Sequence, residues 1–332
     1  MANAALSISI IVPVYNDGVA FERCLDALLM LRPAPHEIIV VADGDTDGSR
    51  QLATARGVRV IELDTPQGPD AARNLGAAVA ASDVLYFVDA DVAVHPDVLL
   101  KISETFAANP NVSAIIGSYD DTPTETNFAS QYKNLTHHYV HQTGNAEAST
   151  FWGACGAVRR EAFEAVGGFH LGYRAIEDIE LGYRMKAAGY RIRLCKDLQV
   201  THLKRWTLVS QVQTDFFGRA LPWTRLIQRD KHLINDLNLD ISSRLSTLLV
   251  GLLLLMLPLV WVGAMRVVVV CCMLGLLVLN RRLYRFLLHK RGVWFTLRAI
   301  PWHWFYYFYS GVAFAVGTIR YKLDNRTIRQ AV

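Results

Sequence analysis

The chain has 332 residues, of which 52% are hydrophobic, and its mean hydropathy of +0.20 is high for a protein that is soluble throughout. Its net charge of +4 is unevenly placed: residues 241–332 hold twelve Lys or Arg and one acidic residue (+11), whereas residues 1–240 hold 22 basic and 29 acidic residues (−7). Five cysteines without CxxC spacing argue against a disulfide framework or a zinc site. The basic, apolar part predicts contact with anionic lipid rather than with nucleic acid.

Strand and helix patterns alternate over the first 120 residues. The β-branched run at 8–14 predicts a first strand and lacks the basic start of a signal peptide, so we expect the catalytic part in the cytoplasm. Further strands are predicted at 37–42, 58–63, 84–88 and 112–117, with helices at 47–55, 69–81 and 96–108. This order predicts an α/β fold with a mainly parallel sheet, in which ligands bind beyond the carboxyl ends of the strands.

Apolar runs dominate the chain after residue 240. The run at 245–265 has 21 uncharged residues, and a helix of that length would be roughly 31 Å long, enough to cross a bilayer. A second run covers 266–280, and a third, rich in Trp and Tyr as at a membrane interface, covers 299–319. We expect two or three membrane segments, the last of which crosses, re-enters or lies at the interface; a buried helical core is the alternative.

Carboxylates follow two of the predicted strands directly. Asp89 and Asp91 come after the strand at 84–88, and their i, i+2 spacing lets both reach one Mg²⁺ or Mn²⁺, which could hold a diphosphate. Asp43, Asp45 and Asp47 follow the strand at 37–42. A solvated turn is the alternative for this second group, although it does not explain three carboxylates at the same sheet edge.

Two further segments carry charged residues at helix starts. Arg73 lies on the first turns of the helix at 69–81, where it could reach a phosphate, with a surface salt bridge as the alternative. Glu177 and Asp178 begin a helix that is predicted to end at Gly189. They either cap the helix or place a carboxylate opposite the metal, as a general base on an acceptor hydroxyl.

These segments occur in the order seen in family 2 glycosyltransferases, which the chain resembles over about residues 7–206. The shared segments are 9–16 (SIIVPVYN), 43–49, 72–74, 89–91 and 177–178. The resemblance implies a GT-A fold over residues 1–240, with an interfacial segment at about 205–240, followed by a membrane region at 241–332. It also implies transfer of a sugar from a nucleotide-sugar donor with inversion.

The resemblance implies roles for individual residues as well. The donor would be bound by Pro13, Tyr15 and Asp43 at the nucleobase, by Arg73 at the diphosphate and by Asp89 at the ribose or sugar. Asp91 would bind the metal, and Asp178 would be the catalytic base. The family commonly has two adjacent Asp where this chain has Ala42-Asp43, so base recognition would rest on Asp43 alone.

The segment at 202–206 (HLKRW) resembles the Gln-x-x-Arg-Trp motif of polymerising family members, with His for Gln. His202 could complete the metal shell, and Arg205 and Trp206 would lie near the diphosphate and the acceptor. The alternative is a basic juxtamembrane segment with a lipid-facing Trp. Trp152, in the run 151–156, would line the acceptor site together with Glu177, or would pack in the core.

We therefore expect a membrane-anchored, metal-dependent glycosyltransferase that acts on a hydroxyl or phosphate of a lipid or lipid-linked glycan at the cytoplasmic side of the cell (inner) membrane. One alternative is a processive polysaccharide synthase, which normally needs more membrane helices. Another is an inactive membrane scaffold with the same fold. A dinucleotide-binding dehydrogenase is improbable, because no GxGxxG follows the first strand.

Overall fold

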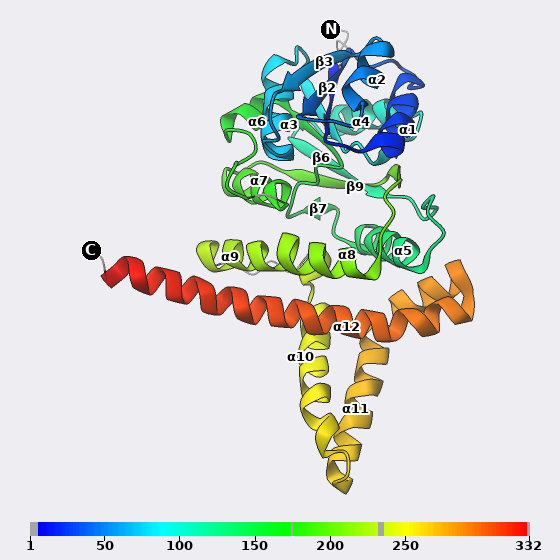
Figure 1. The fold of residues 1–332 in the computed structure, drawn as a ribbon, viewed down its shortest axis with the longest axis vertical. Helices are drawn as coiled ribbons and strands as arrows, with labels where there is room; N and C mark the ends of the chain where they lie inside the picture. The colour runs from blue at the N-terminus through cyan, green and yellow to red at the C-terminus, as the bar shows by residue number, and fades with distance from the viewer. Residues whose placement is uncertain (1–5, 174, 232–235, 331–332) are drawn as a thin grey trace. The chain divides into compact units, whose positions relative to one another are not determined.

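The computed structural model describes residues 6–173, 175–231 and 236–330 (Figure 1). It divides into two compact units, Met1–Arg205 and Trp206–Val332, and each is described by itself. The predicted domains, a catalytic domain at 1–240 and a membrane region at 241–332, stay a prediction.

The first unit is built on a mixed sheet that has nine strands in the described residues, in the order β3-β2-β1-β4-β8-β6-β9-β5, with β7 paired to β9. The parallel half consists of β1 (Ile8–Val14), β2 (Glu37–Asp43), β3 (Arg59–Leu63) and β4 (Val84–Val88). The other half holds β5 (Val92–Val94), β6 (Ala114–Tyr119), β7 (Glu147–Ala148), β8 (Cys155–Arg159) and β9 (Ile192–His202). The predicted α/β fold with a mostly parallel central sheet is confirmed, and the antiparallel pairs β4–β8, β6–β8 and β5–β9 are additional to it.

Seven helices accompany these strands in the described part of the first unit. They are α1 (Gly18–Leu29), α2 (Ser49–Ala55), α3 (Pro69–Val79), α4 (Val98–Ala108), α5 (Phe128–Thr143), α6 (Arg160–Ala165) and α7 (Glu177–Ala187). Pro69 opens α3 with its fixed φ, and acidic residues in the first turn and basic residues in the last turn of α7 complement the helix dipole. Gly189, predicted to end α7, has a φ of 86° just beyond it.

Helix α3 lies unusually close to the sheet at Gly76. A Cβ at this position would be 2.5 Å from Cγ2 of Ile11 in β1 and 3.2 Å from Cγ2 of Val41 in β2. The first contact is too short for a carbon atom and the second is tight, so a larger residue here would force Ile11 or α3 to shift. The approach holds α3 at the sheet, one turn from Arg73.

The second unit consists of helices. They are α8 (Leu208–Gln213), a π-helical segment (Thr214–Ala220), α9 (Leu221–Asp230), α10 (Ile241–Met256), α11 (Gly263–Leu279) and α12 (Arg281–Gln330), with short 3₁₀ turns at Leu237–Leu239 and Leu257–Leu259. Helices α10 and α11 form a hairpin (Figure 1). The buried side chains between them are Val250, Leu253, Val269, Cys272 and Leu276, together with Tyr307 of α12.

The expected helix at 245–265 is not continuous. It ends in the 3₁₀ turn around Pro258, and the chain then reverses before Gly263 to form the hairpin. Proline cannot donate the backbone hydrogen bond that would continue the helix, which explains the break. The predicted run at 266–280 lies in α11, and the run at 299–319 lies inside α12, which is interrupted only at Gly292, where φ is 79°.

Length and composition give one candidate membrane span in the described residues, Ile241–Leu259, with a mean hydropathy of 1.7. A second candidate is the pair Gly263–Leu279 and Arg281–Asp324, which is bent by 64°. The C-terminal membrane region is therefore suggested by one helix, or by two if the bent pair counts as a span.

Polar contacts join α12 to the base of the hairpin. The Asn280 side chain donates to Ser246 Oγ at 3.0 Å, and the Tyr307 hydroxyl donates to Asn280 Oδ1 at 2.7 Å. Gly311 of α12 lies against Thr247 of α10, where an added Cβ would be 2.8 Å from Cγ2. These contacts fix α12 across the two ends of the hairpin.

The close approach at Gly76 gives a first prediction. Gly76→Ala should lower the free energy of unfolding by about 1–3 kcal/mol, because the new methyl group overpacks the contact between α3 and the sheet. Thermal or denaturant unfolding of the purified protein measures this change. Ala78→Ser, at an exposed position of the same helix, is the control and should change the value by no more than about 0.5 kcal/mol. An unchanged or more stable Gly76→Ala protein would contradict the packing described here.

Candidate active site

The carboxyl ends of β1, β2 and β4 meet at one edge of the sheet, because these strands are parallel neighbours. Pro13 is buried in β1 opposite Val41, and Tyr15 just beyond the strand is 51% exposed. Asp43 ends β2 and is buried; its two oxygens accept the backbone N–H groups of Gln67 at 2.7 Å and Gly68 at 2.8 Å. Asp43 therefore holds the loop before α3, and its predicted contact with a nucleobase stays a prediction.

The two other carboxylates of this segment stabilise the start of α2. Asp45 accepts the N–H of Arg50 at 3.1 Å, and Asp47 accepts the N–H of Ser49 at 3.0 Å and that of Gly18 at 2.8 Å. Backbone N–H groups in the first turn of a helix lack partners inside the helix, and nearby carboxylates satisfy them. This is the role of Asp45 and Asp47 in the fold.

Arg73 lies at the centre of the site. Its Nη2 is 2.6 Å from Asp89 Oδ1, its Nη1 is 2.7 Å from Glu177 Oε1, and its side chain is only 5% exposed. Burial works against the charge of the guanidinium, yet the carboxylates of Asp89 and Glu177 raise the pKa of Arg73 above its ordinary value. The alternative of a surface salt bridge is thus replaced by two ion pairs of a buried guanidinium, one to the partly exposed Asp89 after β4 and one to the buried Glu177 at the start of α7.

Asp178 lies next to this ion pair, on the first turn of α7. Its Oδ2 accepts the backbone N–H of Gly153 at 3.1 Å, and its Oδ1 accepts the N–H of Ile179 at 2.7 Å. The two N–H groups orient the carboxylate, and Gly153 directly follows Trp152. The residues predicted for the base and for the acceptor site therefore come together, although their roles are not tested by this arrangement.

Asp91 and His202 meet because β5 pairs with the end of β9, in the register Val92–His202. His202 Nε2 is 3.7 Å and Lys204 Nζ is 3.4 Å from Asp91 Oδ2. Burial opposes ionisation of Asp91, but hydrogen bonding and positive charge from His202 and Lys204 lower its pKa well below the ordinary value. Lys204 was not predicted to take part in the site.

The donor set at Asp91 fits a divalent cation that is shared with a substrate. A carboxylate oxygen and an imidazole nitrogen are ligands that Mn²⁺ accepts, and the ammonium of Lys204 already places positive charge against the same oxygen. No group of three or more His, Cys, Asp or Glu side chains suited to a metal occurs in the described residues. A cation here would thus need further oxygen ligands from a diphosphate or water, which is how Mg²⁺ is commonly held.

An aromatic cluster lies between the two carboxylate centres. Tyr119 stacks on His202 with ring centroids 4.2 Å apart and meets Trp152 edge-on at 4.8 Å. His137 and His141, one turn apart on α5, contact the same Trp152 ring at 5.0 and 5.1 Å. The cluster explains why Trp152 is mostly buried. In the sequence, the i, i+4 spacing of His137 and His141 indicates that both side chains lie on one face of a helix.

Asp17 is a further carboxylate of this edge that the sequence did not single out. It lies at the start of α1, and burial raises its pKa to about 6, with a smaller contribution from the negative charge of Asp91.

Of the remaining predicted residues, Arg205 pairs with Glu125 at 3.0 Å and is exposed, and Trp206 is the first residue of the second unit. Their proposed proximity to the diphosphate and the acceptor stays a prediction.

Comparisons with known proteins give the family. The family model described as "Glycosyl transferase family 2" matches residues 9–167. The succinoglycan biosynthesis protein ExoA of Rhizobium meliloti is 28% identical over 223 residues, which cover 64% of this chain and 68% of that protein. The O-antigen chain rhamnosyltransferase RfbN of Salmonella typhimurium is 25% identical over 240 residues, covering 68% and 76%.

Among solved structures, the mannosyltransferase PcManGT from Pyrobaculum calidifontis, in complex with GDP-Man and Mn²⁺, is similar with a TM-score of 0.57. The likeness covers 96% of this chain and 88% of that one at 17% identity, so it bears on the fold, which is of the GT-A type. The matched family model, the curated relatives and the fold agree with the ordered segments of the sequence. The chain is a glycosyltransferase, and its residues 9–167 are a glycosyl transferase family 2 domain.

Proposed function

We propose that the chain transfers a sugar, with inversion, from a nucleotide-diphosphate sugar to a hydroxyl of a lipid or lipid-linked glycan at a membrane. The observation that carries the proposal is the juxtaposition of Asp89, Arg73, Glu177 and Asp178, which joins the end of β4 to the start of α7. The names of relatives support the substrate classes, since one is an O-antigen chain rhamnosyltransferase and another is bound to GDP-Man.

In this mechanism Asp178 accepts the proton of the acceptor hydroxyl. The hydroxyl oxygen forms the new bond to the anomeric carbon from the face opposite the leaving group, and the bond to the diphosphate breaks with its electron pair going to the diphosphate oxygen. The hydrogen bond from Gly153 N–H keeps the Asp178 carboxylate oriented while leaving it other lone pairs for the acceptor. Inversion follows from this single displacement.

Asp91, with His202 beside it, would hold the divalent cation. When bound, Mg²⁺ or Mn²⁺ supplies neutralisation of the charge that develops on the departing diphosphate. The protein's own contribution at this end is to place Asp91 next to Asp89 through the turn between β4 and β5 and to fix His202 by stacking on Tyr119.

The role of Asp178 gives a prediction. Asp178→Asn should lower kcat about 10²- to 10⁴-fold, the range of a lost general base, with little change in donor binding. Release of nucleoside diphosphate from a panel of UDP-, GDP- and dTDP-hexoses measures kcat, with water in place of an unknown acceptor. An acceptor phosphate would not need a base, because it is already ionised at neutral pH.

Glu161→Gln is the matched control, because Glu161 is likewise an acidic residue in the first turn of a helix, α6. If Asp178 only capped its helix, both variants would keep their activity and lose a similar, small amount of stability. A loss of less than tenfold in Asp178→Asn would count against the base.

Metal dependence can be tested by chelation. Excess EDTA should abolish turnover and added Mn²⁺ or Mg²⁺ should restore it. Mn²⁺ together with a nucleoside diphosphate should raise Tm in the wild-type protein, since a ligand that binds the folded state stabilises it. Asp91→Asn should show no such rise in Tm, and its kcat should be at least about 100-fold lower than that of the wild-type protein. Asp45→Asn is the control, because Asp45 lies at the same sheet edge but binds the start of α2. This variant should keep the rise in Tm and the wild-type kcat. Full turnover in EDTA would contradict the proposal.

We also propose that the chain is bound to the cytoplasmic face of the cell membrane through its second unit. Leu248, Leu252 and Leu255 on α10 are 70%, 42% and 69% exposed, and only 11% of the candidate span is buried, unlike the core helix of a soluble protein. Basic residues gather where α11 passes into α12, namely Arg281, Arg282, Arg285, Lys290 and Arg291. Such charge favours the cytoplasmic side.

The face of α12 supports a position along the membrane surface. Phe305, Phe308, Val312, Ile319 and Leu323 recur at helical spacing and are each at least 38% exposed, whereas Tyr307 and Ala313 on the other side are buried. An exposed apolar stripe flanked by basic residues is typical of a helix that lies in the interface plane. The hairpin of α10 and α11 would then cross and return, with Trp261 at its far end.

Cysteine labelling in membrane vesicles of both orientations tests this topology. In a chain with Cys271→Ser and Cys272→Ser, a membrane-impermeant maleimide should label Trp261→Cys only from the outer face and Lys322→Cys only from the cytoplasmic face. Trp261 is 88% exposed at the hairpin tip, so its cysteine should be reactive once it is reached. Labelling of both positions from one face would contradict a crossing hairpin.

A further inference from the structure

The two ion pairs of Arg73 connect parts of the site that are far apart in the sequence. Asp89 lies 16 residues and Glu177 lies 104 residues from Arg73 along the chain. The guanidinium uses one terminal nitrogen for each carboxylate, a geometry that its planar fork allows and a lysine ammonium on a flexible stem does not reproduce. The distance between β4 and α7 at this edge is therefore set by one rigid group.

The remaining surroundings of the guanidinium are closed. Its carbon Cζ lies 5.4 Å from the centre of the Phe169 ring, and a Cβ added to Gly153 would be 3.1 Å from both Cζ and Nη2. Arg73 Nε is buried and makes no hydrogen bond in the structure. The group is thus enclosed by Phe169 and Gly153 and by its two carboxylates.

Gly153 contacts both the guanidinium of Arg73 and the carboxylate of Asp178. Its backbone lies against Arg73, and its N–H donates to Asp178 Oδ2 at 3.1 Å. Asp178 is also the direct neighbour of Glu177, which Arg73 holds by an ion pair. Arg73 therefore positions the Asp178 carboxylate in two ways, through Gly153 and through Glu177.

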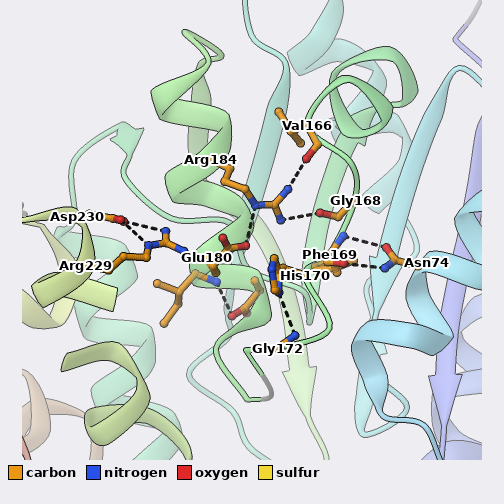
Figure 2. Close-up of polar contacts among 12 residues, drawn as sticks. Asn74, Val166, Gly168, Phe169, His170, Gly172, Glu180, Arg184, Arg229 and Asp230 are labelled. Atoms are coloured by element: carbon orange, nitrogen blue, oxygen red, sulfur yellow. Dashed lines mark hydrogen bonds and ion pairs between the residues drawn. The ribbon is translucent and has the colours of Figure 1, made fainter. Parts of the chain in front are cut away.

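The neighbouring Asn74 fastens the chain that leads into α7 (Figure 2). Its side chain donates to the carbonyl of Phe169 and accepts the N–H of the same residue, both at 2.8 Å. From α7, Arg184 donates to the carbonyls of Val166 and Gly168 and pairs with Glu180 at 2.8 Å. The glycine-containing stretch before α7 is thus tied to α3 and to α7 itself.

We propose that Arg73 is a positioning residue, which sets the spacing between the donor-side carboxylate Asp89 and the base Asp178 by its ion pairs to Asp89 and Glu177 and its contact with Gly153. The inference rests on the proposed function, because it takes Asp178 as the base. It differs from the role that the resemblance implies for Arg73, which is a direct contact with the donor diphosphate. The two roles predict different kinetic effects.

A positioning residue affects the chemical step more than donor binding. Displacing a catalytic group by about 1 Å costs about 100-fold in rate. Arg73→Lys should therefore lower kcat about 100-fold, while Kd for UDP, GDP or dTDP with Mn²⁺, measured by titration calorimetry, changes less than about threefold. Glu177→Gln should give the same pattern, and the double variant should lose no more than either single one, because both act through one unit.

Arg159→Lys is the matched control. Its guanidinium also lies over an aromatic ring, Phe106 at 4.8 Å, but Arg159 pairs with Val84 at the opposite end of β4 from Asp89. This variant should keep kcat and Kd. Gly153→Ala is a second test that leaves every charge in place. Its new methyl group should displace the guanidinium and lower kcat in the same way, so a failure of Arg73→Lys to fold would not end the test.

Each other outcome has a definite meaning. A tenfold or larger rise in Kd for the nucleoside diphosphate in Arg73→Lys, with Glu177→Gln unchanged, would overturn the inference in favour of a diphosphate contact. A lower Tm with normal kcat and Kd would reduce Arg73 to a packing role and overturn it too. Loss of turnover in Asp178→Asn with normal Arg73→Lys defeats the inference alone. Absence of turnover in the wild-type protein with every donor defeats the proposed function and the inference with it.

Discussion

The arrangement of the first unit's site depends on one buried guanidinium. Arg73 pairs with the partly exposed Asp89 at 2.6 Å and with the buried Glu177 at 2.7 Å. Removing Arg73 and Glu177 from water is costly, and a buried ion pair stabilises a fold little compared with well-packed apolar residues. What such a pair provides is a fixed geometry. Here it joins a strand end to a helix start, at the place where the acidic segments 89–91 and 177–178 meet.

The sequence predicted the carboxylates of this edge but not how they are held. Asp43 and Asp89 could be placed together because parallel strands end at the same edge of a sheet, and hydrophobic runs mark the strands. The partners of Arg73 could not be predicted, since an ion pair with Glu177 spans 104 residues and depends on the antiparallel strand β8. Asp17 follows the first predicted strand, but Asn16-Asp17-Gly18 has the composition of an ordinary turn, and Lys204 lies just beyond β9, which is not among the predicted strands.

In the second unit, too, the sequence indicates where the helices lie but not how they pack. The apolar runs were visible in the sequence, and so was the basic segment between them. The turn at Pro258 was overlooked because the residues around it are as apolar as the helix before it, so hydropathy gives no boundary there. The polar contacts among Ser246, Asn280 and Tyr307 then join α12 to α10 and α11, whose exposed side chains are almost all apolar. In an apolar surrounding such hydrogen bonds specify which helices pack together.

The two halves of the site differ in how their charge is balanced. Arg73 is rigid, buried and paired twice, so the spacing between Asp89 and Glu177 is fixed before any substrate binds. At Asp91, His202 is held by stacking on Tyr119, whereas Lys204 reaches the carboxylate on a flexible stem that is 48% exposed. The ammonium of Lys204 is hydrated again when it leaves the carboxylate, whereas the guanidinium of Arg73 is only 5% exposed. We therefore expect Asp91 to exchange its cationic partner Lys204 more readily than Asp89 and Glu177 exchange Arg73.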